Sequence, residues 1–366
     1  MRIGIDASRA NKNIKTGVEW YSYYLLKGLA QIDQDNQYFL YTKTPLQADL
    51  KELPANFQQR MLSWPFPYLW TQLRLPLALS QDKLAVLFLP ASGAPLFKKA
   101  PTVVTIHDLG FLRFPELYSA PARFYHQVSH WQAVRQADKI ITISEFSKKD
   151  IINFFQVEEE KVVVIPLAVD QNIFYPIEEE ESRRILREKY GIKNKYFLYV
   201  GRLEKKKNVS LLLKAWQIFS QKYPDYRLLL IGPGGYGGEE IFSLLEKLKG
   251  IIYFPYISRR DLAVFYSGAT AFVFPSRFEG FGLPLLEAMA CDCPVICSQA
   301  ASLPEVGGKA IWYFSPDDEV KLVELMEMAL DQSSRKKLIA AGRSRVKDFS
   351  WQKTAQLTLG VFKLFA

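Results

Sequence analysis

Short apolar runs alternate with stretches of helical periodicity along almost the whole chain, and this alternation is the feature that most restricts the fold. The runs are apolar at consecutive positions, which is typical of parallel strands buried on both faces. They predict strands at Arg2–Ile5, Tyr38–Tyr41, Ala85–Phe88, Thr102–Ile106, Lys139–Ile143, Val162–Ile165, Tyr196–Val200, Arg227–Ile231, Ile251–Phe254, Ala271–Phe274, Pro294–Cys297 and Ala310–Phe314. Helices are predicted between them, for example at Val18–Ala30, Ala120–Gln136, Ser147–Phe154, Val209–Lys222, Glu239–Lys249, Arg259–Ser267 and Glu319–Gln332. The order predicts an α/β protein with parallel sheets and helices on both faces.

The number of predicted strands is too large for a single doubly wound sheet. The length of 366 residues suits two domains of roughly 150 residues each. The break is visible at Asp170–Asn194, which carries Pro176, the acidic run Glu178–Glu181 and a polar helix but no strand. A new alternation starts at Tyr196. We therefore expect two Rossmann-like domains, residues 1–168 and 169–351, with a linker near Leu167–Tyr175.

Composition narrows the class of protein. With 49% hydrophobic and 23% charged residues the chain is globular, and it has no apolar run of about 18 residues that would cross a membrane. The N-terminus resembles a short strand and not a signal peptide, so a cytoplasmic protein is expected. The net charge of +9 is spread almost evenly over both halves, which favours anionic partners in general and argues against a nucleic-acid binder.

Three cysteines, Cys291, Cys293 and Cys297, are odd in number and lie close together. They are predicted as small buried core thiols in a reducing compartment, because disulfides need pairs and a zinc site needs a fourth ligand. The histidines His126 and His130, four residues apart on a predicted helix, have aromatic neighbours and no acidic one. No metal site is predicted from either group.

The loop after strand Tyr196–Val200 reads Gly201-Arg202-Leu203-Glu204-Lys205-Lys206-Lys207-Asn208. A glycine lets the backbone turn out of the sheet, and clustered Arg and Lys at the carboxyl end of a strand suit a polyanion such as a diphosphate. A solvated basic loop is the alternative, and the loop alone does not decide between them.

The loop after strand Ala271–Phe274 carries two carboxylates, Glu279 and Glu287, on either side of a glycine turn. Pro284 suits the first turn of a helix, whose free N–H groups would point towards an anion. A carboxylate in that helix can accept two hydroxyl hydrogen bonds, as from a ribose, or can serve only as a partner of the helix dipole.

A rival glycine-rich motif, Gly232-Pro233-Gly234-Gly235-Tyr236-Gly237, follows strand Arg227–Ile231. A dinucleotide-binding enzyme would need a carboxylate about 20 residues later at the next strand end, and Ile251–Phe254 offers none. We therefore interpret this segment as a loop that lines a nucleotide cleft.

The loop Gly201–Asn208 and the Glu-x7-Glu stretch Glu279–Glu287 resemble those of the retaining glycosyltransferases of family 4, which have the GT-B fold. Further similarities in the right order are Gly17-Val18-Glu19, His107-Asp108, Ile143-Ser144-Glu145, Ile165-Pro166 and Ser302-Leu303-Pro304-Glu305-Val306. The resemblance covers nearly the whole chain. It implies an α/β GT-B architecture with two Rossmann-like domains whose parallel sheets face a central cleft, and a C-terminal helix, residues 352–366, that crosses back to the first domain.

The resemblance also implies roles for individual residues. Arg202 and Lys207 would neutralise the diphosphate of a nucleoside-diphosphate sugar and stabilise the departing nucleoside diphosphate, while Glu287 would hold the ribose. Glu279 would touch the donor sugar. The implied donor-binding set is completed by Gly201 and by the backbone N–H groups of Phe281, Gly282 and Leu283. Lys205 and Lys206 match no family position.

In the first half, the resemblance implies that Gly17 lets the backbone approach the donor phosphate and that His107 lies near the donor sugar. From the residues alone, Gly17 is a flexible loop glycine, and His107, which follows strand Thr102–Ile106, is equally well explained as a histidine satisfied by a backbone carbonyl. The implied reaction is glycosyl transfer with retention, without a metal or another cofactor, because the cations and a helix N-terminus can offset the charge of the leaving group.

Partners are less constrained. A nucleoside-diphosphate sugar is implied as the donor, with GDP-mannose suggested by a similarity to bacterial mannosyltransferases, and a glycan or a lipid-linked molecule as the acceptor in surface polysaccharide synthesis. The aromatic segment from Trp64 to Trp70 suggests peripheral contact with the inner face of the membrane, or simply a helix packed on its own domain. A sugar-nucleotide epimerase or hydrolase on the same fold is the alternative function.

Overall fold

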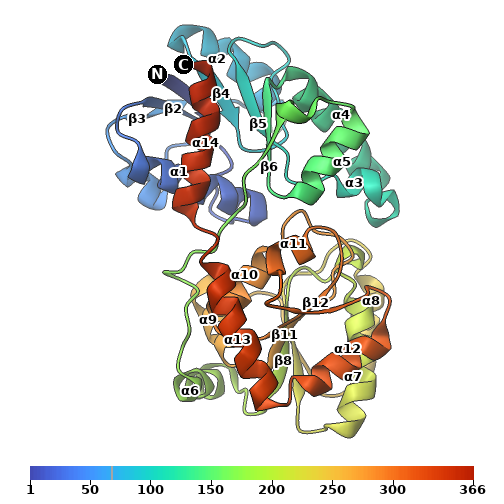
Figure 1. The fold of residues 1–366 in the computed structure, drawn as a ribbon. Coiled ribbons are helices and arrows are strands. Elements are labelled where there is room, and N and C mark those ends of the chain that lie inside the picture. Colours follow the sequence, from blue (N-terminus) through green and yellow to red (C-terminus); the bar gives the residue numbers. More distant parts are fainter. Residues whose placement is uncertain (67–68) are drawn as a thin grey trace. The chain divides into compact units, whose positions relative to one another are not determined.

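The structure, a computed structural model of the chain, describes residues 1–66 and 69–366 and divides into two compact units. The first unit comprises Met1–Pro115, Ala120–Leu167 and Ser350–Ala366, and the second comprises Glu116–Ser119 and Ala168–Phe349. The main division therefore falls one residue before the boundary expected from the sequence. Figure 1 shows a sheet with covering helices in each unit. No helix in the described part of the chain is both long enough and apolar enough to cross a lipid bilayer.

The first unit contains a parallel seven-stranded sheet in the order β3-β2-β1-β4-β5-β6-β7. Its strands are β1 Arg2–Asp6, β2 Gln37–Thr42, β3 Phe57–Met61, β4 Val86–Leu89, β5 Thr102–Thr105, β6 Lys139–Thr142 and β7 Val162–Val164. Its helices are α1 Gly17–Ile32, α2 Leu75–Asp82, α3 Gly110–Arg113, α4 Ala120–Gln136, α5 Glu145–Phe155 and α14 Trp351–Phe362. Every residue of β4 and β5 is buried, as the continuous apolar runs predict.

The second unit contains a parallel six-stranded sheet in the order β10-β9-β8-β11-β12-β13. Its strands are β8 Tyr196–Val200, β9 Arg227–Ile231, β10 Ile251–Phe254, β11 Ala271–Phe274, β12 Val295–Ser298 and β13 Trp312–Phe314. Its helices are α6 Glu179–Tyr190, α7 Val209–Lys222, α8 Glu239–Lys247, α9 Arg259–Ser267, α10 Leu283–Ala290, α11 Leu303–Gly307, α12 Glu319–Met328 and α13 Gln332–Val346. Both sheets thus have the Rossmann-like arrangement expected from the sequence.

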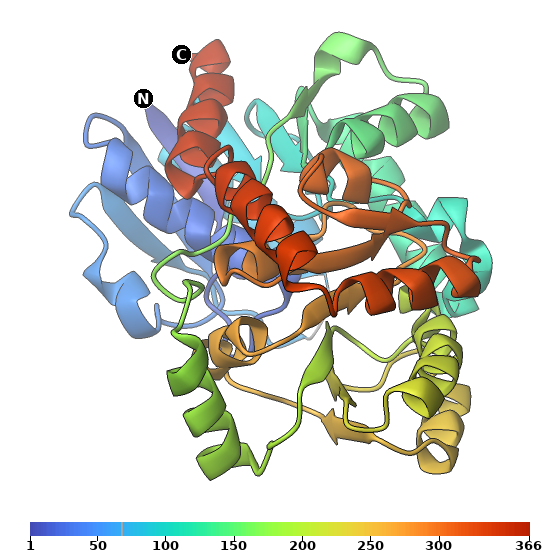
Figure 2. The same cartoon turned by 60° about the horizontal axis from the view of Figure 1, so that its bottom comes forward.

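The helix α14 returns the chain to the first unit and packs along α1 (Figures 1 and 2). Ser350 caps its amino end by accepting a hydrogen bond from the N–H of Lys353 at 3.1 Å. The ring of Trp351 stacks on that of Tyr24 with centroids 5.1 Å apart, and the hydroxyl of Thr354 donates to the Pro166 carbonyl. These contacts join the end of the chain to both the beginning and the end of the first sheet's sequence.

Two elements differ from the sequence predictions. The strand β3 was not predicted, because its central residues Gln58, Gln59 and Arg60 are polar. Polar residues are tolerated here because β3 lies at the edge of the sheet, where some of its side chains face solvent. The predicted helix Glu319–Gln332 is wrong at its end. The helix α12 ends at Met328, and a second helix, α13, begins at Gln332. Asp331 caps α13 by accepting a hydrogen bond from the Ser334 N–H at 2.7 Å.

The three cysteines are buried and free, which confirms their prediction as core thiols. Burial raises the pKa of all three thiols, that of Cys293 to about 12, so none is a thiolate at neutral pH.

The segment from Trp64 to Trp70 is only partly consistent with a membrane contact. Trp70 is buried, and its indole N–H donates to the Leu62 carbonyl at 3.0 Å, so this residue packs on its own unit. Trp64 is half-buried against Phe66, whereas Phe66 itself is 62% exposed. Residues 67–68, which belong to the same predicted segment, lie outside the described residues.

Candidate functional site

Two loops that follow β8 and β11 meet at the carboxyl edge of the second sheet. β8 and β11 are adjacent, and the strand order runs away from them in opposite directions, which is where open α/β sheets bind ligands. The N–H of Arg277 donates to the Lys206 carbonyl at 3.0 Å, and the hydroxyl of Ser276 donates to the same oxygen at 3.4 Å. The loops 201–208 and 275–282 therefore form one surface.

Lys207 and Glu279 form an ion pair at the centre of this surface. The Lys207 Nζ atom lies 2.5 Å from the Glu279 Oε1 atom, and only 16% and 13% of the two side chains are exposed. The ammonium also lies 5.5 Å from the centre of the Phe274 ring at the end of β11. A charge pair with so little solvent contact depends on each partner to balance the other. The resemblance implied that both residues belong to the donor site, but their ion pair was not predicted.

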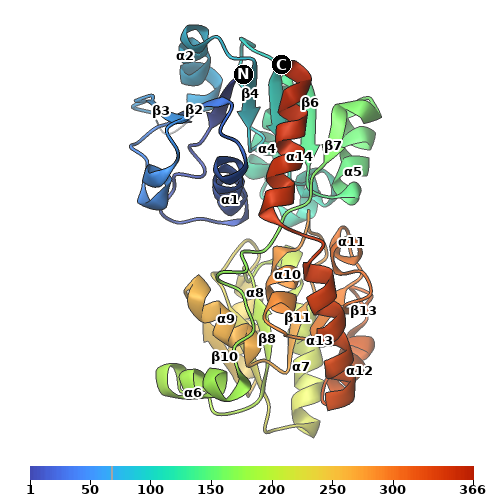
Figure 3. The same cartoon turned by 60° about the vertical axis from the view of Figure 1, so that its left-hand side comes forward.

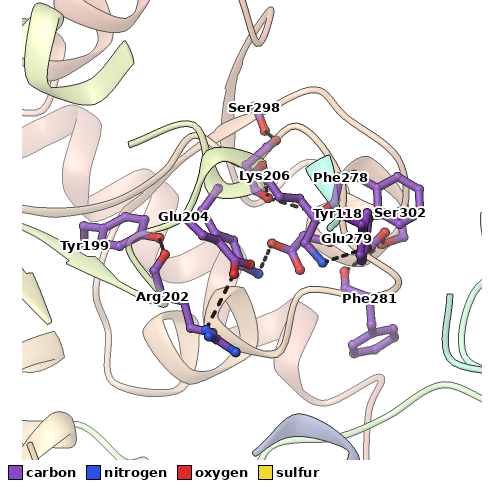
Figure 4. Close-up of polar contacts among 12 residues, drawn as sticks. Tyr118, Tyr199, Arg202, Glu204, Lys206, Phe278, Glu279, Phe281, Ser298 and Ser302 are labelled. Atoms are coloured by element: carbon purple, nitrogen blue, oxygen red, sulfur yellow. Dashed lines mark hydrogen bonds and ion pairs between the residues drawn. The ribbon is translucent and has the colours of Figure 1, made fainter. Parts of the chain in front are cut away.

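Arg202 extends from the same loop with a different environment. Its side chain is 60% exposed, and its Nε atom lies 3.5 Å from Glu204 Oε2 (Figure 4). The backbone beneath it is fixed, because the Tyr199 hydroxyl donates to the Arg202 carbonyl at 2.8 Å. Arg202 is thus a guanidinium with room to turn towards a ligand. Glu204 was not predicted as part of the site. Its position between Arg202 and Lys205 in the sequence could have indicated that it pairs with one of them.

The glycine-rich segment supports this loop from behind. The N–H of Leu203 donates to the Pro233 carbonyl and the N–H of Gly235 donates to the Leu203 carbonyl, both at 2.9 Å. Gly232 has a φ of +141°, and a Cβ atom there would lie 2.1 Å from the Gly201 carbonyl oxygen. The glycines therefore allow backbone to pack on backbone. The helix that follows, α8, begins with Glu239, and a carboxylate there disfavours an anion at this helix end.

The turn before α10 contains backbone N–H groups that have no acceptor. Phe281, Gly282 and Leu283 donate to no acceptor among residues 1–66 and 69–366. Gly282 has a φ of +111°, and a Cβ atom there would lie 2.7 Å from a Leu303 methyl group. A left-handed glycine is required at this position because the chain must turn sharply into the helix. Together the three N–H groups form a cradle for an anion.

Ser302 holds this turn in place. Its hydroxyl lies 2.9 Å from the Glu279 carbonyl and 3.0 Å from the Phe281 carbonyl (Figure 4). Ser298, at the end of β12, bonds in the same way to the Ser276 carbonyl. Neither serine was predicted as a site residue. Ser302 does lie in one of the segments that resemble family 4.

Lys206 is also engaged. Its Nζ atom donates to the Tyr118 hydroxyl at 3.3 Å and lies 5.5 Å from the centre of that ring. Glu116–Ser119 packs with the second unit although it lies within the first half of the sequence. A tyrosine so distant in sequence could not be associated with the loop before the structure was known.

Glu287 lies in α10 and faces α9. Its Oε2 atom accepts from the Tyr266 hydroxyl at 3.3 Å, and its Oε1 atom lies 3.6 Å from an Arg259 nitrogen. Burial raises the pKa of Glu287, and the neighbouring Arg259 guanidinium opposes this effect. The carboxylate has 15% of its side chain exposed and thus a limited face for a ligand. Arg259 was missed in the sequence because its proximity depends on helix packing.

Gly17 and His107 lie in the first unit, at the carboxyl ends of β1 and β5. Gly17 is the first residue of α1, and a Cβ atom there would meet nothing within 4 Å, so packing does not require a glycine. The Nε2 atom of His107 lies 3.0 Å from the Pro90 carbonyl oxygen, and its ring packs edge-on against Tyr21. Burial lowers the pKa of His107, which favours a neutral imidazole.

The structure offers no alternative metal centre in the residues that it describes: nowhere in them do three His, Cys, Asp or Glu side chains gather in a way that would hold an ion. His130 is turned towards the His126 carbonyl at 2.7 Å and packs on Phe111. The predicted independence from metal stays a prediction.

The chain is similar to known glycosyltransferases. The family model described as glycosyl transferases group 1 matches residues 182–345, and that described as glycosyltransferase family 4 matches residues 15–172. O-antigen chain mannosyltransferase B of Escherichia coli is 33% identical over 267 residues, 72% of this chain and 70% of that protein. Serotype-specific mannosyltransferase WbdA of Escherichia coli is 30% identical over 284 residues, which are 75% of this chain and 34% of that longer protein.

Solved structures show the same fold. Sucrose-phosphate synthase from Thermosynechococcus elongatus has a TM-score of 0.79, with 20% identity and coverage of 100% of this chain and 98% of that one. The Anabaena protein HepE, in complex with UDP and glucose, has a TM-score of 0.73, with 17% identity and 99% coverage of both chains.

The fold class is that of a GT-B glycosyltransferase, as the sequence predicts. The chain belongs to the group 1 glycosyl transferases of family 4.

Proposed function

We propose that the protein transfers mannose from GDP-mannose to a glycan or lipid-linked acceptor, with retention of the anomeric configuration. The observation that carries the donor assignment is the Lys207–Glu279 pair at the β8–β11 edge, next to the free N–H groups of Phe281, Gly282 and Leu283. Mannose and the polysaccharide role are supported by the similarity to O-antigen chain mannosyltransferase B. The epimerase or hydrolase alternative finds no support in these comparisons.

In the proposed reaction the leaving group is a nucleoside diphosphate, and its charge is offset by groups that are already in position. Lys207 contributes a nearly buried ammonium, Arg202 a guanidinium that can turn to the phosphates, and the N–H groups before α10 a fixed dipole. Three sources of positive potential make a divalent cation unnecessary, which is why we propose metal-independent transfer. Glu279 then contacts the donor sugar through the oxygen that Lys207 does not occupy.

The remaining roles are proposed from the family resemblance. Glu287 holds the ribose hydroxyls, Gly201 and Gly17 allow close approach of backbone to the phosphates, and His107 lies beside the donor sugar. A neutral imidazole, favoured by the lowered pKa of His107, can act as a hydrogen-bond partner for a sugar hydroxyl.

A donor screen tests the assignment. Thermal melting of the purified protein is measured with GDP-mannose, UDP-glucose and ADP-glucose, each with and without EDTA. We expect the largest rise in melting temperature with GDP-mannose, unchanged by EDTA. The rise should vanish in Lys207→Ala and persist in Lys205→Ala, its exposed neighbour. An active Lys207→Ala enzyme would contradict the site, and a preference for another sugar nucleotide would contradict only the donor.

We also propose that the enzyme acts at the inner face of the membrane, where a lipid-linked acceptor would lie. Since Trp70 is buried, the surface that supports this contact is instead the outer face of α4, where Phe124, Val128 and Trp131 are 69%, 50% and 51% exposed. α4 contains no acidic residue and carries exposed Arg123 and Arg135 near its ends. A stripe of apolar residues with basic neighbours suits an anionic lipid surface.

Vesicle pelleting tests this contact. The protein should sediment with phosphatidylglycerol vesicles and not with phosphatidylcholine vesicles, and Phe124→Ser with Trp131→Ser should abolish sedimentation. Tyr256→Ser, which changes a 78% exposed aromatic residue of the second unit, is the matched control. Equal sedimentation of both variants would exclude α4 as the membrane surface.

A further inference from the structure

A large cavity lies at the amino edge of the second sheet, opposite the edge that carries Lys207 and Glu279. Its volume is about 740 Å³, within the range of small-molecule sites. The strand starts form its base: Tyr196 begins β8, Tyr226 precedes β9, and Thr270 precedes β11. Its sides come from α6 and from the amino end of α13, which lie at the same end of the unit in Figure 3. We refer to it as the amino-edge cavity.

The lining of the amino-edge cavity is strongly basic. It contains five cations, Arg183, Arg187, Lys193, Lys195 and Arg335, and a single carboxylate, Glu179. The carboxylate is already paired with Arg183 at 2.5 Å. In the part of the chain that the structure describes, the other four cations have no carboxylate within ion-pair distance. Nearby Asp331 is used as the cap of α13, and Lys189 on α6 pairs with Asp261 outside the cavity.

Arg335 gives an independent sign of a missing partner. Its Nε atom is buried and has no hydrogen-bond acceptor among the described residues. Buried donors of charged groups are seldom left without an acceptor, because they lose water and gain nothing in exchange. An anionic group in the cavity would offset the charge of the Arg335 guanidinium and would reduce the repulsion among the four cations.

Four of the residues that line the cavity, Leu186, Ile192, Tyr196 and Ala329, are almost wholly covered by their neighbours, so a ligand would meet mainly the cationic rim. The volume of the cavity is larger than a simple inorganic ion needs. An organic molecule with one or more phosphate groups would fill it, with its phosphates at the rim.

We propose that the amino-edge cavity is a second binding site that takes a phosphorylated small molecule, with Arg335, Lys195 and Arg187 as its phosphate ligands. The site is separate from the donor site, because the strands β8, β9 and β11 lie between the two edges.

Calorimetric titration of the full-length protein with fructose 1,6-bisphosphate, in the presence of saturating GDP, tests the site. GDP fills the donor site, so residual binding reports on the cavity. We expect binding that weakens about tenfold or more in Arg335→Gln with Lys195→Gln, since two charged hydrogen bonds are lost. Lys337→Gln, an exposed position on α13 that does not line the cavity, is the matched control and should bind normally.

The outcomes separate this site from the proposed donor site. Binding that survives in Lys207→Ala and fails in the cavity variant supports the proposal even if GDP-mannose is not the donor. Binding that fails in Lys207→Ala and survives in the cavity variant overturns it, as does no binding at all to the unaltered protein. Lys195→Gln alone, at an exposed position, serves if the double variant does not fold. Sedimentation with vesicles that contain phosphatidic acid, lost in the cavity variant, would assign the phosphate group to a lipid.

Discussion

The Lys207 ammonium and the Glu279 carboxylate are 72 positions apart in the sequence, yet their charged atoms lie 2.5 Å from each other in a nearly buried pair. The pair holds the Lys207 side chain in one place at the sheet edge before any donor arrives. Because Glu279 is the partner of Lys207, replacing both residues separates the contribution of Lys207 to stability from its proposed contribution to catalysis.

Replacement of Lys207 by Met should lower the transfer rate by about 10²–10³-fold, because an electrostatic partner of the leaving group is removed. It should also destabilise the protein by roughly 3 kcal/mol, because Glu279 is left as an unpaired buried charge. Adding Glu279→Gln should recover most of the melting temperature and none of the activity. A double variant that recovers activity would show that the pair is only structural, and Lys205→Met controls for loss of charge in the loop.

Replacement of Arg202 by Ala should leave the melting temperature unchanged, because this side chain is 60% exposed and its nearest carboxylate is 3.5 Å away. Affinity for GDP should nevertheless fall about tenfold or more, as measured by calorimetry, since a charged donor to the diphosphate is lost. Arg202→Lys should recover only part of this affinity. Unchanged GDP affinity in Arg202→Ala would remove this residue from the donor site.

Two glycines should respond in opposite ways to replacement by Ala. Gly282→Ala should cost about 1–3 kcal/mol of stability, because its φ is left-handed and a methyl group would strike Leu303. Gly17→Ala should cost no stability, because nothing lies near its Cβ position. If donor phosphate approaches the backbone of Gly17, Gly17→Ala should still lose transfer activity. Full activity of a stable Gly17→Ala enzyme would refute that role.

The buried Glu19 should make stability fall in acid. Burial alone would raise its pKa, but hydrogen bonds from Thr16 and Lys12 outweigh this and lower it to about 2. Because the folded pKa lies below the unfolded value of 4.5, the stabilisation is complete above about pH 4.5 and disappears as the pH falls towards 2.

Glu19→Gln should therefore reduce the free energy of unfolding by roughly 2–3 kcal/mol at pH 7 and by much less at pH 3. Chemical denaturation at both pH values measures the difference, with exposed Glu52→Gln as the control. A penalty that is equal at both pH values would show that the ionised form of Glu19 is not what stabilises α1.

Much of the fold and the centre of the site could be predicted because they depend on local patterns. Buried strands give continuous apolar runs, and parallel strands bring the residues that follow them to one sheet edge, so the loops 201–208 and 275–282 could be placed at one edge. The choice of Lys207 and Glu279 within these loops came from the family resemblance. The edge strand β3 could not be predicted, because its polar residues Gln58 to Arg60 resemble those of a loop.

The partners of the site residues are long-range and were not predictable. Arg259 reaches Glu287 only because α9 packs against α10, and Tyr118 reaches Lys206 although 88 positions separate them. Trp70 was suggested to lie at a membrane-facing surface because its segment is aromatic, but in the structure this residue is buried in the core. Composition alone does not tell which face of a segment is covered.

The return of α14 to the first unit has a consequence for how the protein is made. Residues of α1 and β4 are covered by Trp351, Ala355 and Phe362, which leave the ribosome after every residue of the second unit. The second unit can thus complete its sheet during synthesis, whereas the first must wait with an apolar surface open until Phe362 has emerged. Chains interrupted late in translation would consequently present a finished second unit beside an unfinished first one, and would be substrates for chaperones and proteases.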